Sequence, residues 1–251
     1  MTAWTWGIVP SLVPRLAGAW ADVTDWARAM VDVLFDEVLD HGRCVAVTLP
    51  AEDAAIAAMA AETLLPEERE AAAALAPMRR RGWVGGRVAM REALARIGRT
   101  APPILTDDRG APQLPPGIAG SISHKDRVAV ALAAVEATAR VGVDVEVERP
   151  RKHDIAPKIL RPDELAEIAG LSAEERASAV LLRFSAKEAV YKALDPYVRR
   201  YVGFLEVAVT LRDDGTGQVT PHLREGEGPF VFELRWMKMG ALLVTTARVS
   251  K

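Results

Sequence analysis

Cysteine is almost absent from this sequence. Cys44 is the single cysteine in 251 residues, so no disulfide can form within the chain, and a reducing compartment such as the cytoplasm is expected. Long apolar runs are missing too, because none approaches the ~20 residues that a membrane-spanning helix requires. Residues 1–20 lack the basic start and the continuous apolar stretch of a signal peptide. We therefore expect a soluble, cytoplasmic protein.

Aromatic residues and net charge are also scarce. Aromatics make up 6% of the chain, and the formal net charge is −2. A chain so nearly neutral has no overall electrostatic attraction to nucleic acid or to an anionic membrane, and we expect neither as a partner. Half of the residues are hydrophobic and 26% are charged, which is typical of a folded protein with one large core or two modest ones.

Hydrophobic periodicity and turn signals divide the chain into two groups of helices and strands, before and after residue 138. Helices are expected in the alanine-rich stretch 54–61 and at 64–76, 83–97 and, ended by Asp195-Pro196, about 162–194. Strands are expected at 43–49, 128–135, 141–147, 203–211, 230–237 and 241–249, with a hairpin turn at 213–215 and an irregular connector over 101–117. The pattern predicts an α/β protein with halves 1–138 and 139–251.

Acidic and apolar residues alternate strictly in the predicted strand at 141–148. Successive side chains of a strand point to opposite faces, so Asp144 and Glu146 share one face, with Cα atoms about 7 Å apart. Two neighbouring carboxylates repel each other unless a proton or a cation lies between them, and oxygen ligands favour magnesium. An amphipathic strand with a hydrated acidic face explains the same pattern.

The predicted helix over 183–194 carries a second set of charged residues. Helical spacing places Glu188 and Lys192 on one face and Lys187 with Tyr191 on another. Glu188 could supply a third carboxylate, and the two lysines could neutralise a diphosphate. A solvent-exposed helix explains these residues equally well, as does a helix that begins at Ser185 with a capping box to Glu188.

Seven arginines lie between residues 79 and 99, against a single acid. Arg87 falls only roughly 40° from the centre of the apolar stripe of its helix, so it needs an anionic partner. A phosphate is the usual bidentate choice, and Arg79 and Arg87 are our candidates. The loop expected at 120–124, Gly-Ser-Ile-Ser-His, could hold a phosphate or an adenine edge through Ser123 and His124, although a lone histidine is more often structural.

These pieces, in this order, resemble the Sfp-type 4'-phosphopantetheinyl transferases, in particular the bacterial branch associated with siderophore synthetases. The resemblance depends on Gly-Ser-Ile-Ser-His at 120–124, Gly-Val-Asp-Val-Glu at 142–146, and Phe-Ser-Ala-Lys-Glu-Ala-Val-Tyr-Lys-Ala at 184–193. Supporting matches are Gly-Arg-Val-Ala-Met-Arg at 86–91 and Gly-Ala-Pro at 110–112. The second and third motifs, some forty residues apart, are specific as a pair, whereas either alone is weak.

The resemblance implies two pseudo-symmetric α/β halves with the active site in the seam between them. It implies a monomeric enzyme that transfers the phosphopantetheine arm of coenzyme A to a serine of an apo acyl or peptidyl carrier protein, in a magnesium-dependent reaction that releases 3',5'-ADP. The family implies Asp144, Glu146 and Glu188 as magnesium ligands, with Glu188 and Lys192 as catalytic residues. Coenzyme A contacts are implied for Arg79, Arg87, Ser123, His124, Lys187 and Lys192.

One departure concerns the adenine. Many relatives carry a lysine beside the Gly-x-Pro turn, whereas this sequence has Thr106, Arg109 and Ala111, and Arg109 is a possible substitute. Two alternative functions use the same residues. One is a metal-dependent hydrolase of nucleotide diphosphates such as coenzyme A, and the other is a non-catalytic relative that binds coenzyme A or a carrier protein.

Overall fold

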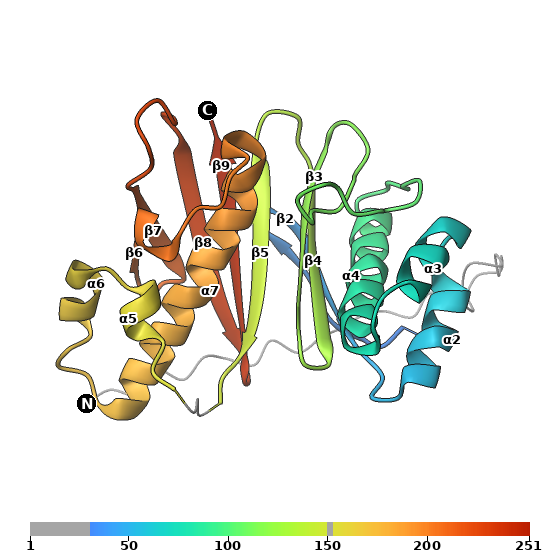
Figure 1. Cartoon of the computed structure of the whole chain (residues 1–251), viewed down its shortest axis with the longest axis horizontal. Helices are drawn as coiled ribbons and strands as arrows, with labels where there is room; N and C mark the ends of the chain where they lie inside the picture. The colour runs from blue at the N-terminus through green and yellow to red at the C-terminus, as the bar shows by residue number, and fades with distance from the viewer. Residues whose placement is uncertain (1–30, 150–152) are drawn as a thin grey trace, which may run out of the picture.

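The computed structural model describes residues 31–149 and 153–251, which form two antiparallel β-sheets with helices packed against them (Figure 1). The first sheet has the strand order β1-β2-β4-β3, and the second has the order β5-β9-β8-β7-β6. The strands are β1 (Val33–Leu39), β2 (Gly42–Thr48), β3 (Ile118–Lys125), β4 (Val128–Val135), β5 (Arg140–Val147), β6 (Val207–Leu211), β7 (Thr216–Pro221), β8 (Val231–Met239) and β9 (Leu242–Ser250). The helices are α2 (Asp53–Thr63), α3 (Pro66–Ala73), α4 (Pro77–Arg96), α5 (Ala156–Ile159), α6 (Pro162–Glu167), α7 (Ala173–Val198) and the 3₁₀ turn η1 (Phe204–Glu206).

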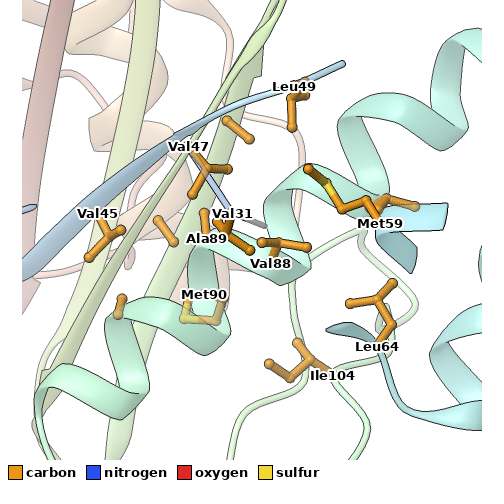
Figure 2. Close-up of a cluster of buried hydrophobic side chains, with 14 of the residues drawn as sticks. Val31, Val45, Val47, Leu49, Met59, Leu64, Val88, Ala89, Met90 and Ile104 are labelled. Atoms are coloured by element: carbon orange, nitrogen blue, oxygen red, sulfur yellow. The ribbon is translucent and has the colours of Figure 1, made fainter. Parts of the chain in front are cut away.

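Helix α4 packs on the first sheet, with α2 and α3 on its outer side (Figure 1). Two glycines of α4 allow this close approach, because a Cβ at Gly85 would lie 2.4 Å from a methyl group of Leu49, and one at Gly86 would lie 2.5 Å from Ile122. The resulting core brings together valines of β2 and apolar residues of α2, α4 and the connector (Figure 2). Burial of this core fixes the position of α4 on the sheet.

Helix α7 packs on the second sheet against β5 and β9. It begins at a capping box in which Ser172 Oγ accepts a hydrogen bond from the Glu175 amide. Near its middle the helix touches the strand backbone, because a Cβ at Gly142 would lie 1.9 Å from the Ala189 carbonyl oxygen. The glycine of the Gly-Val-Asp-Val-Glu motif therefore sets the distance between the acidic strand and the Lys-Glu helix.

The two sheets meet where the edge strands β3 and β5 lie next to each other, in the middle of the molecule (Figure 1). Side chains join them. The Val143 amide donates a hydrogen bond to Ser121 Oγ at 3.1 Å. Further along the same two strands, Ser123 Oγ of β3 donates a hydrogen bond to Asp144 Oδ1 of β5 at 2.8 Å. The acidic face of β5 is buried against α7, with β3 beside it, so the hydrated acidic face that alternation alone allowed is wrong.

Most of the expected elements are present. The strand at 128–135, the hairpin turn at 213–215 and the last two strands lie where the pattern predicted them, whereas the strand expected at 203–211 begins only at Val207, after η1. In the described ranges, no helix is both long enough and apolar enough to cross a bilayer. The fold is a mixed α/β structure with two sheets, one on each side of the predicted division at residue 138.

Three other predictions of secondary structure were wrong. Residues 120–124 belong to β3 rather than to a loop. The helix predicted at 64–76 spans only Pro66–Ala73, because Leu64 is extended and Pro66 occupies the first turn. Helix α7 passes through Pro196 and ends at Arg199, whose left-handed backbone (φ 48°) closes it. Pro196 has no N–H to donate to the carbonyl oxygen four residues earlier, and the helix ends within one turn after it.

Candidate active site

A cavity of about 1160 Å³ lies between α4, the connector and the C-terminal part of α7, and both halves of the chain line it. Its walls carry many cationic side chains, some paired with acids and some not. The cationic side chains of the lining are Arg79, Arg87, Arg109, Arg140, Lys192 and Arg199, and His124 lines it too. A cavity of this size and charge is suited to a large anionic ligand.

Arg87 is buried in the wall of the cavity, at 5% exposure. Its Nε donates to the Ile104 carbonyl oxygen at 3.0 Å, and its Nη2 donates to Thr106 Oγ1 at 2.8 Å. Burial lowers the pKa of Arg87 to about 10, because desolvation disfavours the charged form. No carboxylate of the described residues lies within ion-pair distance of Arg87, so its charge is left for a ligand.

His124 and Arg79 lie on the same side of the cavity as Arg87. The imidazole of His124 fits against α4 where Gly82 has no side chain, since a Cβ there would lie 2.5 Å from the ring. Burial lowers the pKa of His124, and the charge of Lys192 lowers it further, so the ring is neutral at neutral pH. Arg79 is exposed at the rim and has no ion-pair partner in the described part of the chain.

Arg109 lines the cavity and is paired with an acid of the other half. Its Nε and Nη2 donate to the two carboxylate oxygens of Asp195 at 2.7 Å and 2.5 Å, and this bidentate pair raises the pKa of Arg109. A second pair joins the same segments, because Arg199 Nη2 lies 2.8 Å from Asp108 Oδ2. A contact between Arg109 and adenine would therefore compete with the ion pair to Asp195, which the sequence did not reveal.

Asp144 lies at the meeting point of β3, β5 and α7 and is 6% exposed. Its Oδ1 accepts hydrogen bonds from Ser123 Oγ and Lys192 Nζ, both at 2.8 Å. Its Oδ2 accepts one from Ser185 Oγ, also at 2.8 Å. Ser123 thus contacts the carboxylate group rather than lining the cavity, and Ser185, interpreted above as a possible helix start, lies in the interior of α7 and orients Asp144.

Two further carboxylates lie near Asp144. Glu146 is 5% exposed and forms an ion pair with Lys125 at 2.8 Å. Glu188, on α7, has its pKa raised by burial; Lys192 opposes this shift, and the negative charges of Asp144 and Glu146 add to it. The helix and the strand therefore bring the three predicted carboxylates within electrostatic range of one another.

The donor chemistry of this group suits a divalent cation, although the carboxylates are not closed around a metal site. Across 31–149 and 153–251, no three His, Cys, Asp or Glu side chains are grouped tightly enough to hold an ion. Lys192 and Lys125 neutralise two of the carboxylates instead. Burial raises the pKa of Glu188, and the neighbouring carboxylates Asp144 and Glu146 raise it further. A set made only of oxygen donors favours magnesium.

Lys187 does not lie in the cavity. It is 3% exposed, and its Nζ donates to Glu164 Oε2 at 2.6 Å and to the carbonyl oxygens of Ile159 at 2.7 Å and Phe204 at 3.0 Å. Consecutive residues of a helix point about 100° apart, so Lys187 and Glu188 face different neighbours. The three hydrogen bonds hold α5, α6 and η1 against α7, so Lys187 lies away from the cavity in which we expected it to meet the diphosphate.

Sequence reasoning missed several residues of the site, in most cases because their partners are distant in the chain. These are Ser185 and Lys125 beside the carboxylates, Asp195 beside Arg109, and Trp83, whose ring contacts Arg87. Trp83 offered the clearest signal, since it precedes Arg87 by one helical turn.

Known proteins match both parts of the chain. Residues 67–134 match the family described as the 4'-phosphopantetheinyl transferase N-terminal domain, and residues 140–243 match the 4'-phosphopantetheinyl transferase superfamily. The chain is 33% identical to the 4'-phosphopantetheinyl transferase Svp of Streptomyces mobaraensis over 196 residues, covering 74% of this chain and 79% of that protein. It belongs to the Sfp-type 4'-phosphopantetheinyl transferase family.

Other members of the transferase family show similar agreement. PptT of Mycobacterium tuberculosis is 34% identical over 185 residues, covering 70% of this chain and 81% of PptT. Enterobactin synthase component D of Salmonella typhi is 38% identical over 117 residues, covering 46% of this chain and 48% of that protein. A solved structure titled as the ACPS-CoA complex of Chronobacterium ammoniagenes covers 44% of this transferase and 96% of that chain, with 20% identity and a TM-score of 0.36.

Proposed function

We propose that this transferase moves the 4'-phosphopantetheine arm of coenzyme A to a serine of an apo acyl or peptidyl carrier protein and releases 3',5'-ADP. One observation carries the proposal: Lys192 lies both on the wall of the cationic cavity and within 2.8 Å of the buried Asp144. An anion bound in the cavity therefore reaches the carboxylate group, where the transfer takes place.

Coenzyme A supplies two groups of phosphates, and the cavity offers a cation to each. Arg87 lacks an acidic partner in the described structure and, with Arg79, supplies positive charge suited to the 3'-phosphate. A neutral His124 can donate a ring N–H to the same group. Lys192, at the boundary with the carboxylates, is suited to the diphosphate. Ser123 contributes indirectly, because its hydroxyl orients Asp144.

The proposed reaction joins the serine oxygen to the β-phosphorus and breaks the bond from that phosphorus to the bridging oxygen of the diphosphate. The serine proton goes to Glu188, or to a water that Glu188 orients, and the electron pair of the broken bond leaves with 3',5'-ADP. Lys192 stabilises the negative charge that develops on the leaving oxygen. Asp144 holds Lys192 in position through their 2.8 Å contact.

Asp144, Glu146 and Glu188 would hold a magnesium ion, whose chemistry is to neutralise charge on the diphosphate when it is bound. Support comes from the oxygen-only donors and from the proximity of Glu188 to Asp144 and Glu146, whose charges act on its carboxyl group. Removal of the metal with EDTA should abolish transfer, and added magnesium should restore it. Transfer at an unchanged rate in EDTA would contradict the assignment.

The remaining features of the proposal concern organisation. We place the division between the halves at residue 138, because the first sheet ends with β4 at Val135 and β5 begins at Arg140. A single chain supplies every residue of the proposed site, so the enzyme is proposed to act as a monomer. A buried free thiol at Cys44 is compatible with a reducing cytoplasm.

The deciding experiment incubates the protein with coenzyme A, magnesium and a panel of apo-carrier proteins, followed by mass spectrometry of each carrier. We expect one phosphopantetheine to be added to the serine of at least one carrier. Asp144→Ala and Glu188→Gln should remove turnover without unfolding the protein, whereas Lys158→Met, at an exposed site on α5, should react as the wild type does. Cleavage of coenzyme A with no carrier modified would identify a hydrolase instead. Binding without reaction would identify a non-catalytic relative.

A further inference from the structure

The indole ring of Trp83 lies flat against the most deeply buried arginine of the cavity. The Cζ atom of Arg87 is 4.0 Å from the centre of the ring, and both side chains line the cavity. The two residues are one turn apart on α4, the spacing at which helical side chains meet. A guanidinium over an indole face is an attractive cation–π contact, which gains strength where water is excluded.

Thr106, in the connector, contacts the same two side chains. Its Oγ1 accepts a hydrogen bond from Trp83 Nε1 at 3.1 Å and another from Arg87 Nη2 at 2.8 Å. A hydroxyl has two acceptor lone pairs, so both are used, and its single proton is left to donate to a third group. A backbone bridge between Thr106 and Pro112 anchors the threonine in the connector.

These contacts fix the orientation of the Arg87 guanidinium group. One face of the guanidinium is covered by the indole of Trp83, Nε is bound by the Ile104 carbonyl oxygen, and Nη2 is bound by Thr106. Two of the five N–H donors of the arginine thus have protein acceptors, and the remaining donors belong to the edge that lines the cavity. An arginine held in this way loses little side-chain freedom when an anion binds.

We propose that Trp83 and Thr106 are positioning residues that hold Arg87 for a terminal phosphate monoester, and that they thereby set the preference of the enzyme for coenzyme A over its dephospho form. The inference rests on the proposed function, because it takes coenzyme A as the ligand of the cavity. Neither residue needs to touch the ligand, since both act through the orientation of Arg87.

Dissociation constants for coenzyme A and for dephospho-coenzyme A, which lacks the 3'-phosphate, test the proposal. In Trp83→Leu the Kd for coenzyme A should rise roughly 2- to 30-fold, the range that corresponds to a cation–π contact. The Kd for dephospho-coenzyme A should change less than about twofold. Trp83→Phe keeps a ring face and should retain most of the selectivity. Thr106→Val removes the shared acceptor and should reduce it.

Two controls separate positioning from general damage. Trp236→Leu removes a tryptophan of β8, far from Arg87 in the chain, and should leave both Kd values unchanged. In an Arg87→Ala background, Trp83→Leu should have no further effect on selectivity, because the residue through which it acts is gone. Equal losses for both ligands in Trp83→Leu would overturn the proposal, as would a full effect in the Arg87→Ala background.

The Kd values of the wild-type protein distinguish a failure of the proposed function from a failure of the positioning role. If the wild type binds neither ligand, the proposed function has failed and the role of Trp83 fails with it. If the wild type prefers coenzyme A and the Trp83 and Thr106 variants keep that preference, the proposed function stands and only the positioning role is wrong.

Discussion

Exchange of Lys187 for methionine should destabilise the fold by about 3–5 kcal/mol, because it leaves the Glu164 carboxylate charged in a buried site. The two side chains are 3% and 2% exposed, and their Nζ and Oε2 atoms are 2.6 Å apart. After the exchange, Glu164 keeps only the backbone amides of Arg161 and Val209 as donors. Removal of one partner of a buried pair costs far more than loss of an exposed pair.

Urea unfolding followed by circular dichroism measures this loss. With a slope of about 2 kcal/mol per molar urea, the midpoint should fall by roughly 1.5–2.5 M. Lys158→Met, on the neighbouring α5 and exposed, is the matched control and should change stability by less than about 0.5 kcal/mol. Glu164→Gln keeps an acceptor for the Val209 amide and should cost less than Lys187→Met.

The family resemblance offers the competing account, in which Lys187 binds the diphosphate. In that case Lys187→Met would unfold at nearly the wild-type midpoint and would bind coenzyme A poorly. A double-mutant cycle with Glu164→Gln gives a second criterion, because residues in direct contact show non-additive losses, whereas independent residues show additive ones. Stability within about 0.5 kcal/mol of the wild type, together with additive effects, would refute the reasoning from the structure.

Three further predictions follow from individual contacts. Gly142→Ala should cost about 3 kcal/mol or more and lower the urea midpoint, because its Cβ would lie 1.9 Å from the Ala189 carbonyl oxygen; an unchanged midpoint would contradict that packing. Arg109→Ala should change stability by less than about 1 kcal/mol, while hydrogen exchange at residues 107–112 speeds up through loss of the tether to Asp195. His41 is buried and its pKa is lowered, chiefly by desolvation, so stability should fall as the pH drops below 6.5, where the unfolded histidine binds a proton first. His41→Gln should flatten that decline in urea midpoints measured at several pH values. The charged groups facing His41 are Glu233, Arg235, Asp40 and Arg248.

The sequence predicted those features that depend on neighbours along the chain. Strict alternation located β5, and helical spacing put Glu188 and Lys192 on one face. Alternation could not show that Asp144 and Glu146 are buried, because their burial depends on β3, twenty residues earlier. The short polar sequence at 120–124 looks like a loop until it pairs with β4.

Two assignments needed contacts that no local pattern contains. Lys187 looked like a phosphate ligand because its motif resembles that of a family, but α5, α6 and η1 each supply one oxygen acceptor to its ammonium group. Arg109 looked like a substitute for a missing lysine, and Asp195 holds it through a pair 86 residues apart in the chain. In both cases a competing partner from a distant segment decided where the cation points.

The side-by-side placement of β3 and β5 has a consequence for the integrity of the chain. Each is the outermost strand of its own sheet, and an outermost strand with free amides and carbonyls is a template on which foreign strands can add. In this protein each half covers the edge strand of the other half, through side-chain hydrogen bonds such as the one from the Val143 amide to Ser121 Oγ. Fragments produced separately from the two halves would each expose an edge strand. Co-expression of the two fragments should therefore give a higher yield of unaggregated protein than expression of either fragment alone.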